Sequence, residues 1–451
     1  MKLVLEPDQV NMRRHLLSRR RAALYCGMGR GKTAATLAAI TDTIIDTAGG
    51  ALVIAPLNVC LLTWPSECEL WERFRWLRVA NLRTKDGMLA WFAGTADIYL
   101  INWESIPAFV NKVMAYVRKG DTLPANILVY DELSKAKSHS SKRVNIWRRF
   151  TYLFTYHWGL TGTPNPNSYL DLFAQFRLLC GANSPLGTAF GKFQHEYFEP
   201  VDWNQYKWKL KYGSKEKIEA LIAPYVFSLG AGDFPMDVID REVKLPPAAV
   251  KFYDKLETDL LAQMKDKVVT ASNAAVLVQK LLQVTSGCVY NEEREMVVIH
   301  NEKIKELKAI RKEHPKEPLL VVTLFKHERK RIMEAFPEAE LFSSEPEALA
   351  RWNAGRIRMW IIDPRSAGHG LNLQAPSHIA VWVSLTYSRE YFDQTNARLA
   401  RKGQKHKVLI YRLICPETVD HAVSAVLEHK GSQQKGLLTA LSHIKTLHDN
   451  T

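Results

Sequence analysis

The chain has 451 residues, 47% of them hydrophobic and 24% charged, with a formal net charge of +14 at pH 7. That length exceeds what one hydrophobic core supports and predicts two or three domains. No run of about 18 apolar residues occurs, and the six cysteines form neither a C-x-x-C pair nor a zinc-finger spacing. The apolar stretch at the start of the sequence is too short for the hydrophobic region of a secretion signal. We therefore expect a cytoplasmic protein and exclude a membrane-spanning or disulfide-rich one.

Short apolar, β-rich runs alternate with helical patterns in both halves of the chain, which is typical of buried parallel strands. The expected strands are residues 51–55, 98–102, 127–130, 158–161, 319–324, 357–362, 379–384 and 408–413. Residues 249–310 are expected to be mostly helical, and turn residues at 230–235 and 245–247 mark a boundary. The prediction is an α/β fold with helical insertions and two lobes, residues 1–235 and 236–451, joined near residue 240.

The first motif lies in residues 25–36, which read YCGMGRGKTAAT. Gly29 and Gly31 allow backbone N–H groups to surround a phosphate, and a helix starting at Lys32 adds its positive dipole end. Lys32 can reach the β and γ oxygens of a nucleotide, and the Thr33 hydroxyl can ligate Mg²⁺. The strict P-loop pattern has a glycine where this chain has Cys26, so a plain glycine turn before a helix is the alternative.

The second motif is the pair Asp131 and Glu132, which ends the apolar run 127–130. At the carboxyl end of a parallel strand, Asp131 can hold Mg²⁺ and Glu132 can orient the attacking water. An ordinary strand end is the alternative. Residues 160–164, LTGTP, follow as a third strand-to-turn break that supplies hydroxyls. The three motifs together predict a nucleoside triphosphatase.

Two further motifs occur in the second half: the glycine-rich turn 366–373, SAGHGLNL, and residues 394–404, QTNARLARKGQ. Arg398 and Arg401 are three residues apart, so a helix would turn both to one side. Both can act as arginine fingers that stabilise charge in the transition state. A basic helix that faces solvent is the alternative.

These motifs, in this order, resemble those of superfamily-two helicases, specifically the Swi/Snf-like double-stranded DNA translocases, along nearly the whole chain. The resemblance implies two RecA-like lobes, ATP and Mg²⁺ as cofactors, and a C-terminal brace that begins at residues 418–420. It implies that Gln9 reads the adenine and that Gly370 and Gln394 belong to the nucleotide site. It also implies contacts with the DNA strand or the DNA-side motifs for Pro56, Trp64, Glu67, Trp71, Asn102, Trp103, Glu104, Thr161, Thr163 and Asn167.

The chain departs from the family pattern at several positions. Cys26 and Gly27 stand where acidic residues are usual, and Ser134 replaces a histidine that helps to couple hydrolysis to the DNA-side motifs. Residues 228–231, SLGA, replace paired arginines. These departures put coupling efficiency in question rather than ATP hydrolysis. Without appended modules, the sequence resembles the compact members found in bacteria and phages.

Basic residues are in excess, 61 against 47 acidic ones, and they cluster at residues 13–21, 207–217 and 398–407. Such an excess favours a polyanionic partner, although each cluster can also be a solvated face. Residues 206–212, YKWKLKY, alternate with the period of a strand that places its lysines on one face. Contact with nucleic acid and a protective edge strand remain equal alternatives for this segment.

The predicted function is a DNA-stimulated ATPase motor that translocates on double-stranded DNA with low sequence specificity, remodelling DNA or displacing bound proteins. The expected state is a monomer in a bacterial cytoplasm or a phage-infected cell. A strand-separating DNA or RNA helicase is the first alternative. An ATP-gated nucleic-acid clamp that does not translocate is the second.

Overall fold

A computed structural model of the chain describes residues 2–117, 122–136, 138–162, 164, 168–201, 203, 207–230, 232, 234–265, 271–291, 293, 295–367 and 371–428. The chain folds as two compact units, Met1–Gly232 and Asp233–Thr451. This division lies three residues before the predicted one at 235/236, and residue 240 lies in a strand of the second unit. None of the helices in the described ranges has the length and apolarity that a membrane span requires.

The first unit is built on a parallel sheet with strand order β3-β4-β2-β5-β6-β1-β9. Its strands are β1 (Arg21–Cys26), β2 (Gly50–Ala55), β3 (Val79–Asn81), β4 (Ile98–Asn102), β5 (Ala125–Asp131), β6 (Tyr156–Thr161) and β9 (Val226–Leu229). Every residue of β2 and β4 is buried, as expected for strands covered on both faces. The four strands predicted in this half of the chain are therefore confirmed as β2, β4, β5 and β6.

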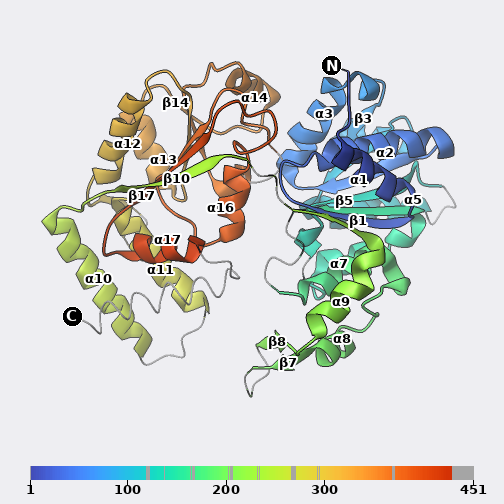
Figure 1. Cartoon of the computed structure of the whole chain (residues 1–451), viewed down its shortest axis with the longest axis horizontal. Helices are drawn as coiled ribbons and strands as arrows, with labels where there is room; N and C mark the ends of the chain where they lie inside the picture. The colour runs from blue at the N-terminus through green and yellow to red at the C-terminus, as the bar shows by residue number, and fades with distance from the viewer. Residues whose placement is uncertain are drawn as a thin grey trace. The chain divides into compact units, whose positions relative to one another are not determined.

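Helices cover both faces of this sheet. Ala51 and Val53 of β2 pack in one core with α1, α2 and α3, whereas Leu52 and Ile54 pack in another with α4, α5 and α6. In Figure 1, α1 and α2 lie on one side of β1 and β5, and α7 lies on the other. The helix bounds are α1 (Pro7–Leu17), α2 (Lys32–Thr47), α3 (Trp64–Leu70), α4 (Lys85–Ala93), α5 (Ile106–Val117), α6 (Lys142–Arg148) and α7 (Asp171–Cys180).

A small subdomain lies between α7 and β9 in the chain, formed by α8 (Phe190–Tyr197), α9 (Ser214–Ile222) and a hairpin of β7 (Phe198–Pro200) and β8 (Trp208–Leu210). The strand predicted over residues 206–212 is thus shorter than expected and has an antiparallel partner. Lys209 forms a 3.0 Å ion pair with Glu199 across the hairpin. Lys211 donates from Nζ to the backbone carbonyl oxygens of His195 (2.5 Å) and Glu196 (3.2 Å) at the end of α8. Lys209 and Lys211 therefore have local structural partners.

The second unit has a parallel sheet of its own, with strand order β10-β17-β16-β13-β15-β14. Its strands are β10 (Met236–Glu242), β13 (Leu319–Val322), β14 (Ala339–Leu341), β15 (Met359–Ile362), β16 (Ile379–Trp382) and β17 (Val408–Ile414). The four apolar runs predicted in this half form β13, β15, β16 and β17. A short hairpin of β11 (Cys288–Tyr290) and β12 (Met296–Val298) interrupts the region predicted as helical.

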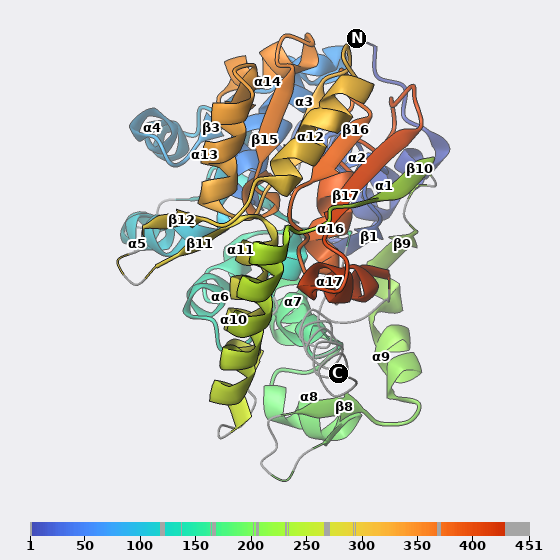
Figure 2. The same ribbon diagram turned by 90° about the vertical axis from the view of Figure 1, so that its left-hand side faces the viewer.

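Helices also flank the second sheet. α12 and α13 share one core with alternate residues of the strands, and they lie in front of β15 and β16 in Figure 2. On the opposite face, Trp352 of α14 packs on Trp360, and Phe392 of α16 packs on Trp382. The helix bounds are α10 (Pro247–Lys265), α11 (Ala271–Thr285), α12 (Glu302–Glu313), α13 (Lys326–Ala335), α14 (Pro346–Asn353), α15 (Pro364–Ala367), α16 (Arg389–Asn396) and α17 (Val419–Glu428). Each unit is thus a parallel sheet between two helical layers, which is the predicted RecA-like architecture.

Candidate nucleotide-binding and hydrolysis site

The loop from β1 to α2 turns around two glycines. Gly29 and Gly31 have φ angles of +76° and +72°, a left-handed conformation that residues with a Cβ rarely adopt. Gly31 is the N-cap of α2, so the first N–H groups of the helix lack intrahelical partners and can bind an anion. A Cβ on Gly31 would lie 1.9 Å from Nε2 of Gln9, which places the Gln9 amide directly against the loop.

Lys32 is the first residue of α2, and its ammonium group folds back over the same loop. Its Nζ donates to the carbonyl oxygens of Cys26 (2.6 Å) and Gly27 (3.2 Å). A Cβ on Gly162 would lie 3.8 Å from this Nζ, so the third motif reaches the phosphate loop. Thr33 follows Lys32 on the helix and is half-buried. The loop therefore offers backbone donors, an ammonium group and a hydroxyl together.

Asp131 ends β5, and the sheet order places β6 directly beside β5 and β1 on the far side of β6. Its Oδ2 accepts a 2.9 Å hydrogen bond from Nε1 of Trp64. Burial raises the pKa of the Asp131 carboxyl to about 6, although the Trp64 hydrogen bond and the charge of Lys32 oppose that shift. The Asp131 carboxyl is costly to ionise because it is buried, and a bound cation would offset that cost. Since Asp131 lies near Lys32 and the loop from β1 to α2, it is suited to bind a cation at this position.

Glu132 follows in a left-handed conformation, with φ of +58°. Its Oε1 accepts hydrogen bonds from the hydroxyls of Ser134 (2.5 Å) and Thr161 (3.0 Å). Non-glycine residues in this region carry strain that surrounding contacts must offset. Two hydroxyls therefore fix a strained carboxylate at the same edge of the sheet as Lys32 and Asp131.

The predicted arginines of the second unit converge, although not on a helix as expected. α16 ends at Asn396 because the backbone then tightens: Arg398 N bonds to Thr395 O and Leu399 N to Asn396 O. Nη1 of Arg398 and Nη1 of Arg401 both donate to the carbonyl oxygen of Leu371, at 3.4 and 2.9 Å. The backbone turn after α16, and not helical periodicity, brings the two guanidinium groups together.

Comparison with known proteins assigns the family. The family model described as SNF2-related domain matches residues 10–323. The chain belongs to the SNF2-related family. A protein of Acyrthosiphon pisum secondary endosymbiont phage 1 is 30% identical over 452 residues, which cover 95% of this chain and 96% of that protein. The ATP-dependent helicase/translocase YwqA of Bacillus subtilis is 22% identical over 91% of this chain, which spans 45% of its length.

Among solved structures, the Sulfolobus solfataricus SWI2/SNF2 ATPase core in complex with dsDNA covers 98% of this chain and 94% of its own, with 20% identity and a TM-score of 0.45. The SNF2-related match includes Lys32, Asp131 and Glu132 and ends before Arg398 and Arg401. The family assignment makes the chain an ATP hydrolase and makes ATP its nucleotide.

Two tryptophans of this SNF2-related core have a role that the sequence did not predict. Trp64 and Trp103 were expected in segments that contact DNA, but they are 0% and 1% exposed. Trp64 follows a π-helical turn, Val59–Thr63, and bonds to the side chain of Asp131, while Nε1 of Trp103 donates to its carbonyl oxygen (3.0 Å). The two indoles hold Asp131 from both ends. Sequence spacing could not indicate this, because Trp64 and Asp131 are 67 positions apart.

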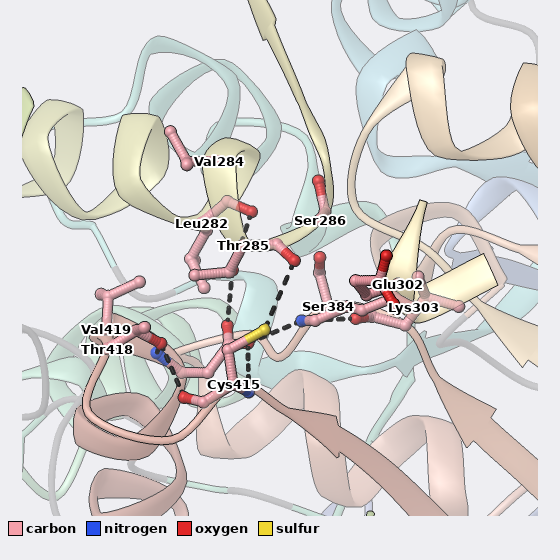
Figure 3. Close-up of polar contacts among 12 residues, drawn as sticks. Leu282, Val284, Thr285, Ser286, Glu302, Lys303, Ser384, Cys415, Thr418 and Val419 are labelled. Carbon is pink, nitrogen blue, oxygen red and sulfur yellow. Dashed lines mark hydrogen bonds and ion pairs between the residues drawn. The ribbon is translucent and has the colours of Figure 1, made fainter. Parts of the chain in front are cut away.

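The predicted brace begins within the second unit, at the start of α17. Oδ2 of Asp420 lies 2.6 Å from Nζ of Lys303, and its Oδ1 accepts from the Thr285 hydroxyl (2.9 Å). The backbone N–H of Cys415 donates to the same carboxylate (3.1 Å), and Lys303 donates to the carbonyl oxygen of Val383 (2.9 Å). Figure 3 shows Thr285, Lys303 and Cys415 gathered around this cluster. It ties α11, α12 and the end of β17 to α17.

Of the remaining predicted residues, Gln394 is 2% exposed, and its Nε2 donates to Glu390 Oε1 (3.1 Å). Gly370, Thr163 and Asn167 lie outside the described residues. In the first unit the structure therefore brings together Gln9, Gly29, Gly31, Lys32, Thr33, Asp131 and Glu132.

Proposed function

We propose that the chain is an ATP-driven motor that translocates on double-stranded DNA and thereby remodels DNA or displaces bound proteins. The observation that carries the proposal is the meeting of Lys32, Asp131, Glu132 and Thr161 at one edge of the first sheet. Membership of the SNF2-related family and a relative named as a helicase/translocase support motor activity. The net charge of +14 supports a polyanionic track.

In this proposal the loop from Gly29 to Thr33 binds the phosphates through backbone N–H groups. Lys32 exchanges its two carbonyl partners for phosphate oxygens, and Gln9 contacts the base. The Thr33 hydroxyl and the Asp131 carboxylate are oxygen donors of the kind that Mg²⁺ prefers, so the residues present fit this ion. Mg²⁺ would supply charge neutralisation at the β and γ phosphates.

Glu132 orients the attacking water and accepts its proton, while Ser134 and Thr161 keep the carboxylate in place. Because Thr161 belongs to the third motif, its hydrogen bond connects hydrolysis with the DNA-side loop. Ser134 thus takes over at least the positioning part of the family's histidine.

Arg398 and Arg401 act on the γ-phosphate when the two units close on ATP, with Gly370 and Gln394 near the nucleotide. Each round of closure and reopening moves the grip along one DNA strand. Contacts to sugar and phosphate carry little sequence information, which explains the expected low specificity.

The test measures ATP turnover without polymer and with single-stranded DNA, duplex DNA and RNA, together with triplex displacement and unwinding of a forked duplex. Duplex DNA should stimulate turnover most, the triplex strand should be displaced, and the fork should stay paired. Unwinding would favour the strand-separating helicase. Stimulation without displacement would favour the ATP-gated clamp, and a preference for RNA would contradict the proposal.

A further inference from the structure

A hollow occurs in the second unit, at the edge of its sheet where the strands begin. It has a volume of about 290 Å³ and is lined by the residues that directly precede β13, β16 and β17. Asp363, by contrast, follows the carboxyl end of β15, at the opposite edge. The hollow is therefore separate from the glycine-rich motif that follows β15. Its lining includes Lys316, Glu317, His378, Gln404, Lys405 and His406.

The lining is predominantly cationic. Lys316 and Lys405 are exposed at its rim, and the rings of His378 and His406 lie 4.9 Å apart. Among the described residues of the lining, Glu317 is the single carboxylate. Among the residues that the structure describes, no group of three His, Cys, Asp or Glu is placed to hold a metal ion. The charges thus favour an anion over a cation.

Further positive groups surround the turn that carries Lys316. Arg358 donates from its guanidinium to the carbonyl oxygens of Pro315 (2.6 Å) and Lys316 (2.5 Å). Arg311 donates to the carbonyl oxygen of Glu317 (2.7 Å). Because these guanidinium groups fix the backbone of the turn, Lys316 and Glu317 project from a rigid support.

The opposite wall is fixed by the side chain of Gln404. Its Nε2 donates to the carbonyl oxygen of Ser377 (2.8 Å), and its Oε1 accepts from the backbone N–H groups of Lys405 (2.9 Å) and His406 (3.1 Å). Lys405 and His406 are therefore preorganised next to His378, which lowers the entropic cost of binding a ligand between them.

We propose that this hollow binds a phosphate-bearing anion through Lys316, Lys405, His378 and His406. The anion is a free phosphate compound or a backbone phosphate of nucleic acid, because both present the same tetrahedral oxygens. This site is distinct from the P-loop and does not depend on the motor function proposed above.

Binding should depend on pH. Burial lowers the pKa of His378, the neighbouring His406 lowers it further, Glu317 raises it and His314 lowers it. Lys316, Lys405, Arg311 and Arg358 add positive charge around the turn, and His314 is hydrogen-bonded to the Tyr411 hydroxyl (2.8 Å). An anion stabilises the imidazolium form, so it raises the pKa of His378 and binds more tightly as pH falls from about 8 to 6.

The experiment follows the histidine ring protons by NMR in the full chain while inorganic pyrophosphate is added, and then repeats the titration with a short DNA duplex. The resonances of His378 and His406, assigned with the H378Q and H406Q variants, should shift, and the pKa of His378 should rise by about 0.5 or more. His421, exposed on α17, should not respond. The probe that acts at lower concentration identifies the source of the phosphate.

Two variants have opposite expected effects, which separates binding from misfolding. The K316A/K405A variant should weaken pyrophosphate binding at this site about tenfold, since each substitution removes one positive charge near the anion. E317Q should strengthen pyrophosphate binding several-fold, because it removes an opposing carboxylate from the lining. Because the P-loop also binds pyrophosphate, the readout is restricted to His378 and His406. Unmoved resonances with both probes, or weaker binding in E317Q, would overturn the proposal.

Discussion

A lysine and an aspartate occur together both at the edge of the first sheet that carries Lys32 and in the interior of the second unit, but the two pairs are arranged differently. Asp131 is buried, accepts an indole N–H and has a pKa raised to about 6. Lys32, near it, donates to two backbone carbonyls. Lys303 and Asp420 instead lie 2.6 Å apart, and both side chains are 0% exposed. Attraction to Asp420 outweighs burial and raises the pKa of Lys303.

The difference distinguishes a site from a structural pair. At the first-unit edge, Lys32 donates to two neutral carbonyls and Asp131 accepts from a neutral indole, and these partners can be exchanged for phosphate or a cation. In the second unit the charges neutralise each other, and nothing is gained by a ligand. Buried charge alone therefore does not indicate function, whereas a buried charge whose hydrogen-bond partners are neutral and replaceable does.

The largest effect is expected for Lys32→Ala. Loss of the ammonium should lower ATP turnover by at least about 10²–10³-fold, because it removes stabilisation of the phosphate charge in the transition state. The thermal midpoint should change less than turnover does, since Lys32 is only half-buried and its hydrogen bonds to Cys26 and Gly27 are local. Turnover and differential scanning fluorimetry check this, with the exposed Lys112→Ala as the matched control.

Glu132→Gln should retain ATP and stall before hydrolysis, and wild-type turnover in either variant would dismiss the site.

Arg401→Ala extends the comparison to the turn after α16. ATP binding should persist, and kcat should fall by about 10³-fold, because a finger stabilises transition-state charge and not the ground state. Arg398 is 7% exposed and also donates from Nε to the Gln394 carbonyl oxygen (2.9 Å), so Arg398→Ala should in addition loosen the turn. Separate measurement of nucleotide Kd and kcat decides; weaker binding with unchanged kcat would make these arginines ground-state ligands.

Lys303→Met tests the structural pair. Removing one partner leaves Asp420 charged and uncompensated, which should lower the free energy of unfolding of the second unit by about 3–5 kcal/mol. Denaturant unfolding measures this, and the surface pair of the exposed Lys305 and the half-buried Glu302 is the control, because Lys305→Met should cost less than about 1 kcal/mol. The K303M/D420N double variant should regain part of the loss. A cost equal to that of Lys305→Met would refute the contrast.

The sequence predicted the features that depend on neighbouring residues in the chain, and it missed those that depend on contacts between distant residues. Apolar runs predicted β2, β4, β5, β6, β13, β15, β16 and β17, because strands buried on both faces need uninterrupted apolar residues. β10 was missed, since its sequence MDVIDRE contains four charged residues and no long apolar run, and its pairing partner, β17, is distant in the chain. The motifs predicted Lys32 and Asp131, whereas the role of Trp64 and the turn that joins Arg398 to Arg401 depend on tertiary contacts.

Asp131→Asn should change stability by less than Lys303→Met does, and it should raise stability while it abolishes activity. Burial raises the pKa of Asp131 from its ordinary 3.8 to about 6, so the folded state binds the proton more tightly than the unfolded state. Stability is therefore lost as pH rises from about 4 to 6, and the cost at pH 8 is at most about 3 kcal/mol. The variant should lack this cost. Its thermal midpoint should exceed that of the wild type at pH 8 and match it near pH 4, while ATP turnover is lost; a midpoint unchanged at pH 8 would show that Asp131 bears no burial penalty.

The smallest effect concerns the lysines of the β7–β8 hairpin, which are neither paired in a core nor part of the nucleotide site. Trp203 and Tyr212 near them are 98% and 106% exposed, so aromatic rings and charge are available to a polymer together. If Lys207 and Lys209 contact phosphates, the K207A/K209A variant should reduce the slope of log K against log salt by up to about 0.9 for each lost contact. Lys211 is left in place because its ammonium holds the end of α8. K85A/K112A, which alters exposed lysines elsewhere in the first unit, controls for net charge. An equal change of slope in both variants would identify the hairpin lysines as protective surface residues, since only a direct contact makes their position matter.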